Sequence, residues 1–295
     1  MRVGMIGLGI MGSAMARNMV RHGLHVVGFD ISGVAMSACA AEGCHTASSA
    51  REVAETTDVA LTSLASVAAF HDVIDDLAQA GSSGAVIADT STLPIAEKEI
   101  GRAALAKSGM ILLDCPLSGT GAQAAVGDLV VFASGEQTAY EVCRPAFAGM
   151  SRQQRYLGAF GNGSRMKFVA NHLVNIHNVA AAEAFVLGRA AGLDPELIYE
   201  VIADSAGSSR MFQIRGPMMA KGEYGHATMK IETWLKDLQI ISQFASDLHC
   251  PLALFTTAVQ PYLSALAQGR GKEDTAAVCA VLEQAAGLIA PKAGR

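Results

Sequence analysis

The first half of the chain alternates short apolar runs rich in β-formers with segments of helical periodicity. This alternation is typical of a parallel sheet with helices on both faces, so we expect an α/β, doubly wound, Rossmann-type domain. The expected strands cover residues 3–6, 25–29, 59–64, 85–89, 111–115 and 129–134. The expected helices cover residues 11–21, 33–41, 66–79, 94–107 and 137–147, with Thr92 as the N-cap before Pro94.

After Gly158 the strand signals end and Ala/Leu/Val periodicity takes over, interrupted at 192–195, 206–209 and 249–251. This pattern predicts an all-α second half that begins with one helix over 164–191, about 42 Å long at 1.5 Å per residue. We expect that helix to join a dinucleotide-binding domain, 1–161, to a helical substrate and oligomerisation domain, 162–295. The tail after Ala290 is expected to fray.

A glycine-rich segment directly follows the first expected strand and opens the first expected helix. Its G-x-G-x-x-G spacing provides a tight turn, close approach of the backbone to a pyrophosphate, and close packing of helix on strand. The helix start would also present N–H groups to the phosphates. An ordinary tight turn is the alternative for this spacing alone, but its place between strand and helix favours a dinucleotide. The candidate cofactor residues are Gly7, Leu8, Gly9, Ile10, Met11 and Gly12.

Asp30 ends the second expected strand, 23 positions after Gly7. A carboxylate at this point can accept hydrogen bonds from the ribose hydroxyls of the adenosine, and it would repel a 2′-phosphate. The next cationic side chain after Asp30 is Arg51. The sequence therefore predicts NAD as cofactor in preference to NADP, although a solvated surface aspartate is the alternative.

Two further segments carry candidate substrate chemistry. The turn that contains Ser118 and Thr120 follows a strand, and its hydroxyl and backbone N–H groups can cradle a carboxylate. Lys167 and Asn171 are four positions apart on the long helix, so they project from one face, where a lysine can exchange a proton with a substrate oxygen and an amide can orient it. The alternatives are a strand-to-turn connection without a ligand and a solvated helix surface.

A charged pair, Lys236 and Asp237, is flanked by apolar residues on another expected helix. This pair can present its charges to a cleft. An exposed ion pair on an amphipathic helix is the alternative.

Composition narrows the classes of function. The chain is 51% hydrophobic, 17% charged and 5% aromatic, with a net charge of −5 and a pI of about 5.9. This balance disfavours nucleic acid and anionic membranes as partners, and no window approaches the ~20 apolar residues of a membrane span. The six cysteines form no C-x-x-C pair, so we expect reduced thiols and a cytoplasmic protein. The cysteines and histidines form no cluster with the spacing of metal ligands, so no metal site is expected.

In their order along the chain, these motifs resemble the β-hydroxyacid dehydrogenase family, which includes 3-hydroxyisobutyrate dehydrogenases and is related to the dinucleotide-binding domain of 6-phosphogluconate dehydrogenase. The resemblance extends from the first strand to the Lys-Asp-Leu segment, most of the chain. The motifs that carry it are Gly-Leu-Gly-x-Met-Gly at 7–12, Ser91-Thr92 before Pro94, Pro116-x-Ser118-Gly119, Gly161-x-Gly163-x-x-x-Lys167-x-x-x-Asn171, and Lys236-Asp237-Leu238.

The resemblance implies a Rossmann-type NAD(P) domain joined by a long helix to an all-α domain, with the active site between them. It implies that Lys167 is the catalytic acid/base, that Asn171 holds the substrate, and that Ser118, Gly119 and Thr120 bind its carboxylate. It also implies that Lys236 approaches the nicotinamide with Asp237 near the substrate, and that the cofactor cleft is lined by Leu64, Ala65 and Thr92.

The resemblance also implies an activity. We expect an NAD-dependent oxidoreductase that moves a hydride between nicotinamide and a small 3-hydroxy carboxylate or its semialdehyde or keto acid, of the 3-hydroxyisobutyrate, tartronate semialdehyde/glycerate, 4-hydroxybutyrate or threonate type. A homodimer or homotetramer is expected.

Three departures from the family pattern leave the substrate open. Thr120 replaces a frequent glycine, His172 replaces a frequent Asn or Gln, and Ala65 replaces a frequent proline. The alternatives are an imine reductase of the same superfamily, which Lys167 disfavours, and a catalytically inactive dinucleotide-binding interaction module, which the joint presence of Lys167, Asn171 and Ser118 disfavours.

Overall fold

The computed structural model describes residues 1–81 and 84–288, so the tail expected to fray after Ala290 lies outside the described residues. The chain divides into two units, one up to Phe168 and the other from Val169. This division falls inside a single long helix.

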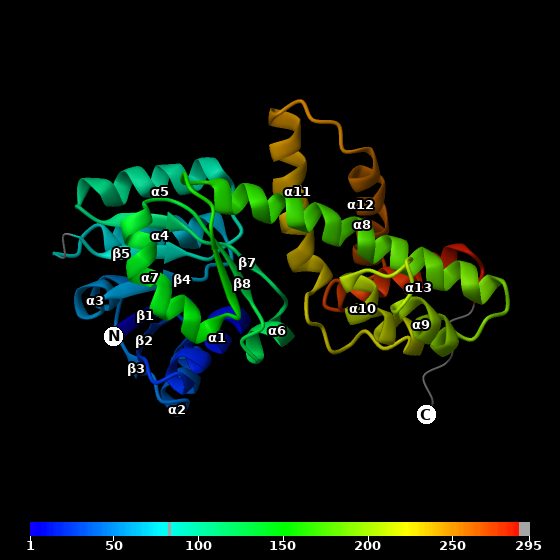
Figure 1. The fold of residues 1–295 in the computed structure, drawn as a ribbon, viewed down its shortest axis with the longest axis horizontal. Coiled ribbons are helices and arrows are strands. Elements are labelled where there is room, and N and C mark those ends of the chain that lie inside the picture. Colours follow the sequence, from blue (N-terminus) through cyan, green and yellow to red (C-terminus); the bar gives the residue numbers. More distant parts are fainter. Residues whose placement is uncertain (82–83, 289–295) are drawn as a thin grey trace. The chain divides into compact units, whose positions relative to one another are not determined.

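A six-stranded parallel sheet forms the centre of the first unit, in the order β3-β2-β1-β4-β5-β6 (Figure 1). Val3 of β1 lies opposite Val26 of β2 and Val59 of β4, and all three are buried. The register thus aligns apolar side chains across neighbouring strands, which confirms the predicted Rossmann-type sheet. Its strands are β1 (Arg2–Ile6), β2 (His25–Phe29), β3 (His45–Thr46), β4 (Val59–Thr62), β5 (Val86–Asp89) and β6 (Ile111–Asp114).

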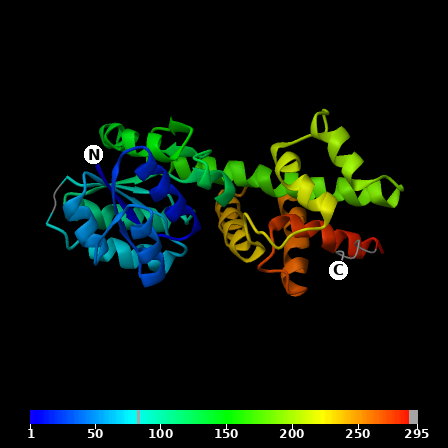
Figure 2. The same ribbon diagram turned by 90° about the horizontal axis from the view of Figure 1, so that it is seen from below.

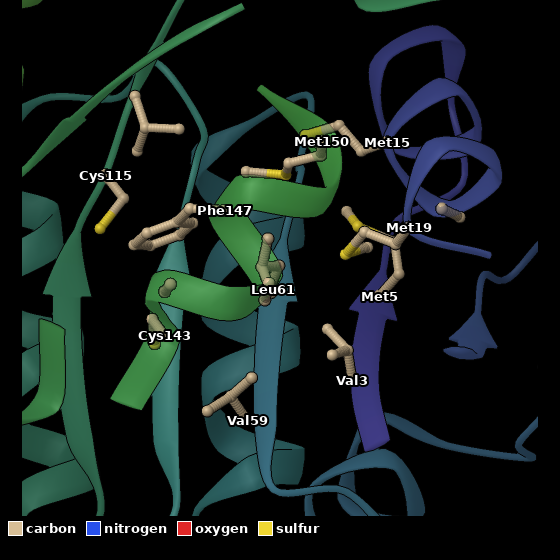
Figure 3. Packing of buried hydrophobic residues seen from close by; sticks show 14 of the residues in the cluster. Val3, Met5, Met15, Met19, Val59, Leu61, Cys115, Cys143, Phe147 and Met150 are labelled. Carbon is tan, nitrogen blue, oxygen red and sulfur yellow. The ribbon is translucent and has the colours of Figure 1, made fainter. Parts of the chain in front are cut away.

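Helices cover both faces of this sheet because alternate strand residues point to opposite sides. On β4, Val59 and Leu61 belong to one buried cluster and Ala60 to another. Figure 3 shows the first cluster, in which residues of α1 (Ile10–Arg21) and α7 (Gln137–Met150) pack on β1 and β4. The second cluster takes residues from α3 (Ala50–Thr56), α4 (Val67–Leu77) and α5 (Ile95–Lys107). Helix α2 (Gly33–Ala41) follows β2.

The expected strand over 129–134 belongs to a second, three-stranded sheet. There β8 (Val130–Ala133) pairs antiparallel with β7 (Leu117–Ser118) and parallel with β9 (Gln153–Tyr156). Sequence patterns missed β9 because its four residues, Gln-Gln-Arg-Tyr, show no apolar alternation. They also missed the two-residue β3 and β7 and the short helices α3 and α6 (Gly121–Ala125).

The prediction that Thr92 caps the helix after β5 was wrong. Helix α5 begins at Ile95 and its N-cap is Pro94. The ψ angle of Pro94 is 137°, so the backbone remains extended through this residue and turns helical only after it. The N-cap position therefore falls two residues after Thr92.

One long helix, α8 (Asn162–Ala190), runs from the first unit into the second and agrees with the predicted 164–191. The remaining helices of the second unit gather along it (Figure 2). Three breaks between them fall at the predicted positions, where Asp194 and Ser209 cap the helices that follow, but the segments 222–230 and 268–274 also separate helices and were not predicted. These helices are α9 (Pro195–Ala203), α10 (Arg210–Lys221), α11 (Ile231–Asp247), α12 (Ala253–Ala267) and α13 (Val278–Ala285), with a 3₁₀ turn at Thr275–Ala277.

No helix in the described part of the chain is both long enough and apolar enough to cross a membrane.

Candidate functional site

The carboxyl ends of the parallel strands place four predicted segments at one edge of the large sheet. The glycine loop follows β1, Asp30 follows β2, Leu64 lies after β4, and Thr92 lies after β5. The strand order reverses between β1 and β4, and ligands of open α/β sheets bind at the carboxyl edge where this reversal occurs.

The backbone of the glycine loop favours glycine at two of its positions. Gly7 has a φ of +89°, which favours glycine, and a Cβ on Gly12 would clash with the carbonyl oxygen of Gly7. A Cβ on Gly9, in contrast, would meet no described atom within 4 Å. Gly9 is the N-cap of α1 and supplies no side chain to its first N–H groups. These groups and the space over Gly9 fit a dinucleotide phosphate.

Asp30 is held by the backbone on both sides. Its Oδ2 accepts the Leu8 N–H at 2.7 Å and its Oδ1 accepts the Ser32 N–H at 2.8 Å. Because each carboxylate oxygen has a second lone pair, Asp30 can still accept ribose hydroxyls. Ile31 and Val34 beside it are 97% and 82% exposed, so the loop offers apolar surface next to this carboxylate.

The segments after β4 and β5 are tied to each other. The Leu64 N–H donates to Ser91 Oγ at 2.8 Å, and the Thr90 hydroxyl donates to the carbonyl oxygen of Thr62 at 2.6 Å. Ala65 is exposed and Thr92 is half-buried. The predicted cofactor residues Leu64, Ala65 and Thr92 therefore lie on two neighbouring connections fixed by hydrogen bonds.

The predicted carboxylate loop leads from β7 into α6. Gly119 has a φ of +141°, and a Cβ there would lie 2.5 Å from Leu129 Cδ2, so only glycine fits. Thr120 is the N-cap of α6, but its hydroxyl contacts with Gln123 are long, 3.4 and 3.5 Å. Together with the bond that the Thr120 N–H donates to Gln123 Oε1 at 3.1 Å, these contacts form a capping box in which the hydroxyl bonds are the longer ones.

Helix α8 carries Lys167 and Asn171, four residues apart on one helix face. Lys167 is 9% exposed and Asn171 is 4% exposed, so neither is the ordinary surface residue that was the alternative. Asn171 Nδ2 donates to Asp237 Oδ2 at 3.2 Å, and Lys236 Nζ lies 3.2 Å from Asp237 Oδ1. The second unit thus brings Asn171, Lys236 and Asp237 into one polar group.

Sequence reasoning missed a buried polar group under this edge of the first unit. Lys98 of α5 is completely buried between Asp89 at the end of β5 and Asp114 at the end of β6. An aspartate at the end of two successive apolar strands, with a lysine on the helix between them, was the available signal.

In the described ranges, no three His, Cys, Asp or Glu side chains are arranged to hold a metal ion. All six cysteines are free thiols.

Comparison with known proteins places both halves of the chain. Residues 2–158 match the model for the NAD binding domain of 6-phosphogluconate dehydrogenase, and residues 161–282 match the model for the NAD-binding of NADP-dependent 3-hydroxyisobutyrate dehydrogenase. L-Threonate dehydrogenase of Cupriavidus necator is 33% identical over 280 residues, 94% of each chain.

Solved structures agree with these matches. The crystal structure of a 3-hydroxyisobutyrate dehydrogenase from Salmonella typhimurium has a TM-score of 0.86 at 33% identity and covers 95% of this chain and 99% of its own. An imine reductase from Pseudomonas sp. covers 95% of this chain and 99% of its own, with a TM-score of 0.61 at 19% identity, and so shares the fold alone.

Proposed function

Because the chain belongs to the β-hydroxyacid dehydrogenase family and is an oxidoreductase of CH–OH groups that uses a nicotinamide dinucleotide, we propose that it oxidises a small polyhydroxylated carboxylic acid with NAD. The threonate type is favoured because relatives 30–34% identical are named L-threonate dehydrogenase. The observation that carries the catalytic part is the place of Lys167, which is buried one helical turn before Asn171, itself held by Asp237.

The residues divide the work as follows. Gly7 to Gly12 hold the pyrophosphate, Asp30 the adenosine ribose, and Leu64, Ala65, Thr92 and Lys236 the nicotinamide side. NAD supplies the hydride acceptor. Lys167 accepts the proton of the substrate hydroxyl as the C–H bond breaks, and returns it to the oxygen in the reverse reduction.

We assign the binding of the substrate to two groups of residues. Ser118, Gly119 and Thr120 bind its carboxylate through hydroxyl and backbone N–H groups. Asn171, oriented by its hydrogen bond to Asp237, holds the reacting hydroxyl against Lys167. A rigid amide of this kind favours one orientation of the substrate. Orientation of the reacting groups is the protein's main contribution beside the chemistry of the cofactor.

A screen of hydroxyacids and semialdehydes with NAD and with NADP tests this function. The absorbance of the reduced cofactor reports turnover. Turnover of threonate or another polyhydroxy acid with NAD is the expected result. Failure of every hydroxyacid and semialdehyde with both nicotinamides would contradict the proposal.

The Thr120 hydroxyl is expected to set the choice among acids. In Thr120→Val the shape is kept and the hydroxyl is lost, so a substrate hydroxyl that it meets is left unpaired at a cost of about 1–3 kcal/mol. We expect kcat/KM for a threonate-type acid to fall roughly tenfold to a hundredfold while that for 3-hydroxyisobutyrate is spared. The matched control is Thr120→Ser, which keeps the hydroxyl. Equal losses for both acids in Thr120→Val would show that the loop reads only the carboxylate.

We also propose that the chain forms a homodimer or homotetramer. Leu187 near the end of α8, Leu193 in the following turn, and Leu197 and Val201 of α9 are each about half exposed or more. Large apolar side chains gathered at one end of a helical unit are typical of a self-association surface. Light scattering at micromolar concentration should show an oligomer, and Leu187→Glu with Leu197→Glu should dissociate it. A monomeric wild-type chain would contradict this.

A further inference from the structure

A single lysine forms the centre of the polar group buried in the first unit. Lys98 Nζ lies 2.8 Å from Asp114 Oδ1 and 2.9 Å from Asp89 Oδ2, and it donates to the carbonyl oxygen of Ser91 at 2.7 Å. Lys98 thus makes two hydrogen bonds, to Asp114 and Ser91, and an ion pair with Asp89. The lysine and both aspartates have no exposed surface.

Lys98 is charged in this environment. Burial alone would lower the pKa of Lys98, but the carboxylates of Asp114 and Asp89 outweigh it and raise the pKa above its ordinary value. The group therefore holds one positive and two negative charges away from water. Replacing such buried charges by apolar residues is often neutral or stabilising, so stability alone gives little reason for them.

On one side, Asp89 connects the buried group to the predicted cofactor segments after β4 and β5. We call these contacts its first arm. Asp89 Oδ1 accepts the hydroxyls of Thr62 and Ser91, each at 2.6 Å. Ser91 Oγ in turn accepts the N–H of Leu64 at 2.8 Å. The connections after β4 and β5, which carry Leu64 and Thr92, are thus fixed to the buried lysine.

On the other side, Asp114 connects the buried group to the start of α8. These contacts form its second arm. Asp114 Oδ2 accepts the Ser164 N–H and Asp114 Oδ1 accepts the Ser164 hydroxyl, both at 2.7 Å. Ser134 also donates its hydroxyl to Asp114 and accepts the Gly163 N–H at 2.9 Å. Lys167 follows Ser164 by three residues, on the next turn of the same helix.

We propose that Lys98 is a positioning residue, which fixes the nicotinamide-lining segments and the helical turn carrying Lys167 to one common point. The proposal rests on the function proposed above, because that function assigns the nicotinamide side to the first arm and the acid/base Lys167 to the second. Hydride transfer needs the proton acceptor and the nicotinamide side held in register, and a misplacement of about 1 Å can cost about 10²-fold in rate.

The test separates positioning from stability by variants that trim each arm. Ser164→Ala removes one hydrogen bond to Asp114. Lys98→Met with Asp89→Asn removes the lysine and keeps the net charge of the group at minus one. The matched control is Ser151→Ala, which deletes a buried hydroxyl that donates to the Phe147 carbonyl oxygen at 2.7 Å, outside the group. Thermal unfolding is followed for each variant so that kcat is compared only among folded proteins.

We expect kcat to fall about tenfold in Ser164→Ala and 10- to 100-fold in the double variant, with substrate KM changed less than threefold. Ser151→Ala should keep kcat within twofold. In the double variant, hydrogen exchange should also quicken at the first turn of α8. If the double variant unfolds at a lower temperature but keeps the wild-type kcat, Lys98 has a structural role only and the inference is wrong.

Failure of the proposed function gives a different result. If Lys167→Ala keeps the wild-type kcat, the catalytic assignment is wrong and the positioning role falls with it. If Lys167→Ala is inactive while the double variant and Ser164→Ala keep their kcat, only the inference about Lys98 fails.

Discussion

Lys167→Ala is expected to lower kcat by roughly 10²–10⁴, the range for loss of a general acid/base. Lys167 is buried on α8, four residues before Asn171, so the substitution removes the only proton acceptor assigned to the substrate hydroxyl. Steady-state kinetics with the best substrate of the screen gives the value. Folding should persist because alanine is the best helix former and the site lies inside a long helix.

Two controls make the result specific. Dinucleotide affinity, measured by titration of the cofactor against protein fluorescence, should be unchanged in Lys167→Ala. Lys221→Ala at the exposed end of α10 should leave kcat as it is. A kcat within threefold of wild type for Lys167→Ala would remove this residue from the mechanism.

NADP should be a poorer cofactor than NAD, with kcat/KM lower by roughly fivefold to several hundredfold. The cause is the repulsion between Asp30 and the 2′-phosphate. Two unit charges about 4 Å apart repel by about 1 kcal/mol in water and about 4 kcal/mol near a protein surface. Asp30 is partly exposed, so high salt should weaken the preference.

Charge and shape at this position can be separated. Asp30→Asn keeps the shape and one acceptor for the backbone N–H groups but loses the charge, so it should narrow the gap between the cofactors. Asp30→Arg should weaken the binding of NAD and allow the 2′-phosphate of NADP to bind. Equal or better kcat/KM of the wild type with NADP would sink the prediction.

The periodicity of the sequence predicted the large sheet, the long helix and the helical second half. This succeeded because buried parallel strands read as short apolar runs, and the Gly-Leu-Asp-Pro segment at 192–195 carries its own helix stop and start signals. It failed for β9 and β3, whose residues gain strand geometry only from the neighbours they pair with. Their local sequence has no strand signal.

Motif spacing could predict residues whose role lies in the local backbone. The glycines at 7, 9 and 12 and the aspartate at the end of β2 are of this kind, because a loop between one strand and one helix has few alternatives. The spacing of Lys167 and Asn171 placed them on one face, but their burial emerged only from packing.

The sequence by itself determined the kind of fold, the dinucleotide loop and the candidate acid/base, since each depends on residues close together in the chain. Only the tertiary structure showed that Lys98, Asp89, Asp114 and Ser164 form one buried group, and that Asn171 meets Asp237 across 66 positions. Hydrogen bonds act over about 3 Å, and which distant groups come that close is decided by how the strands and helices pack.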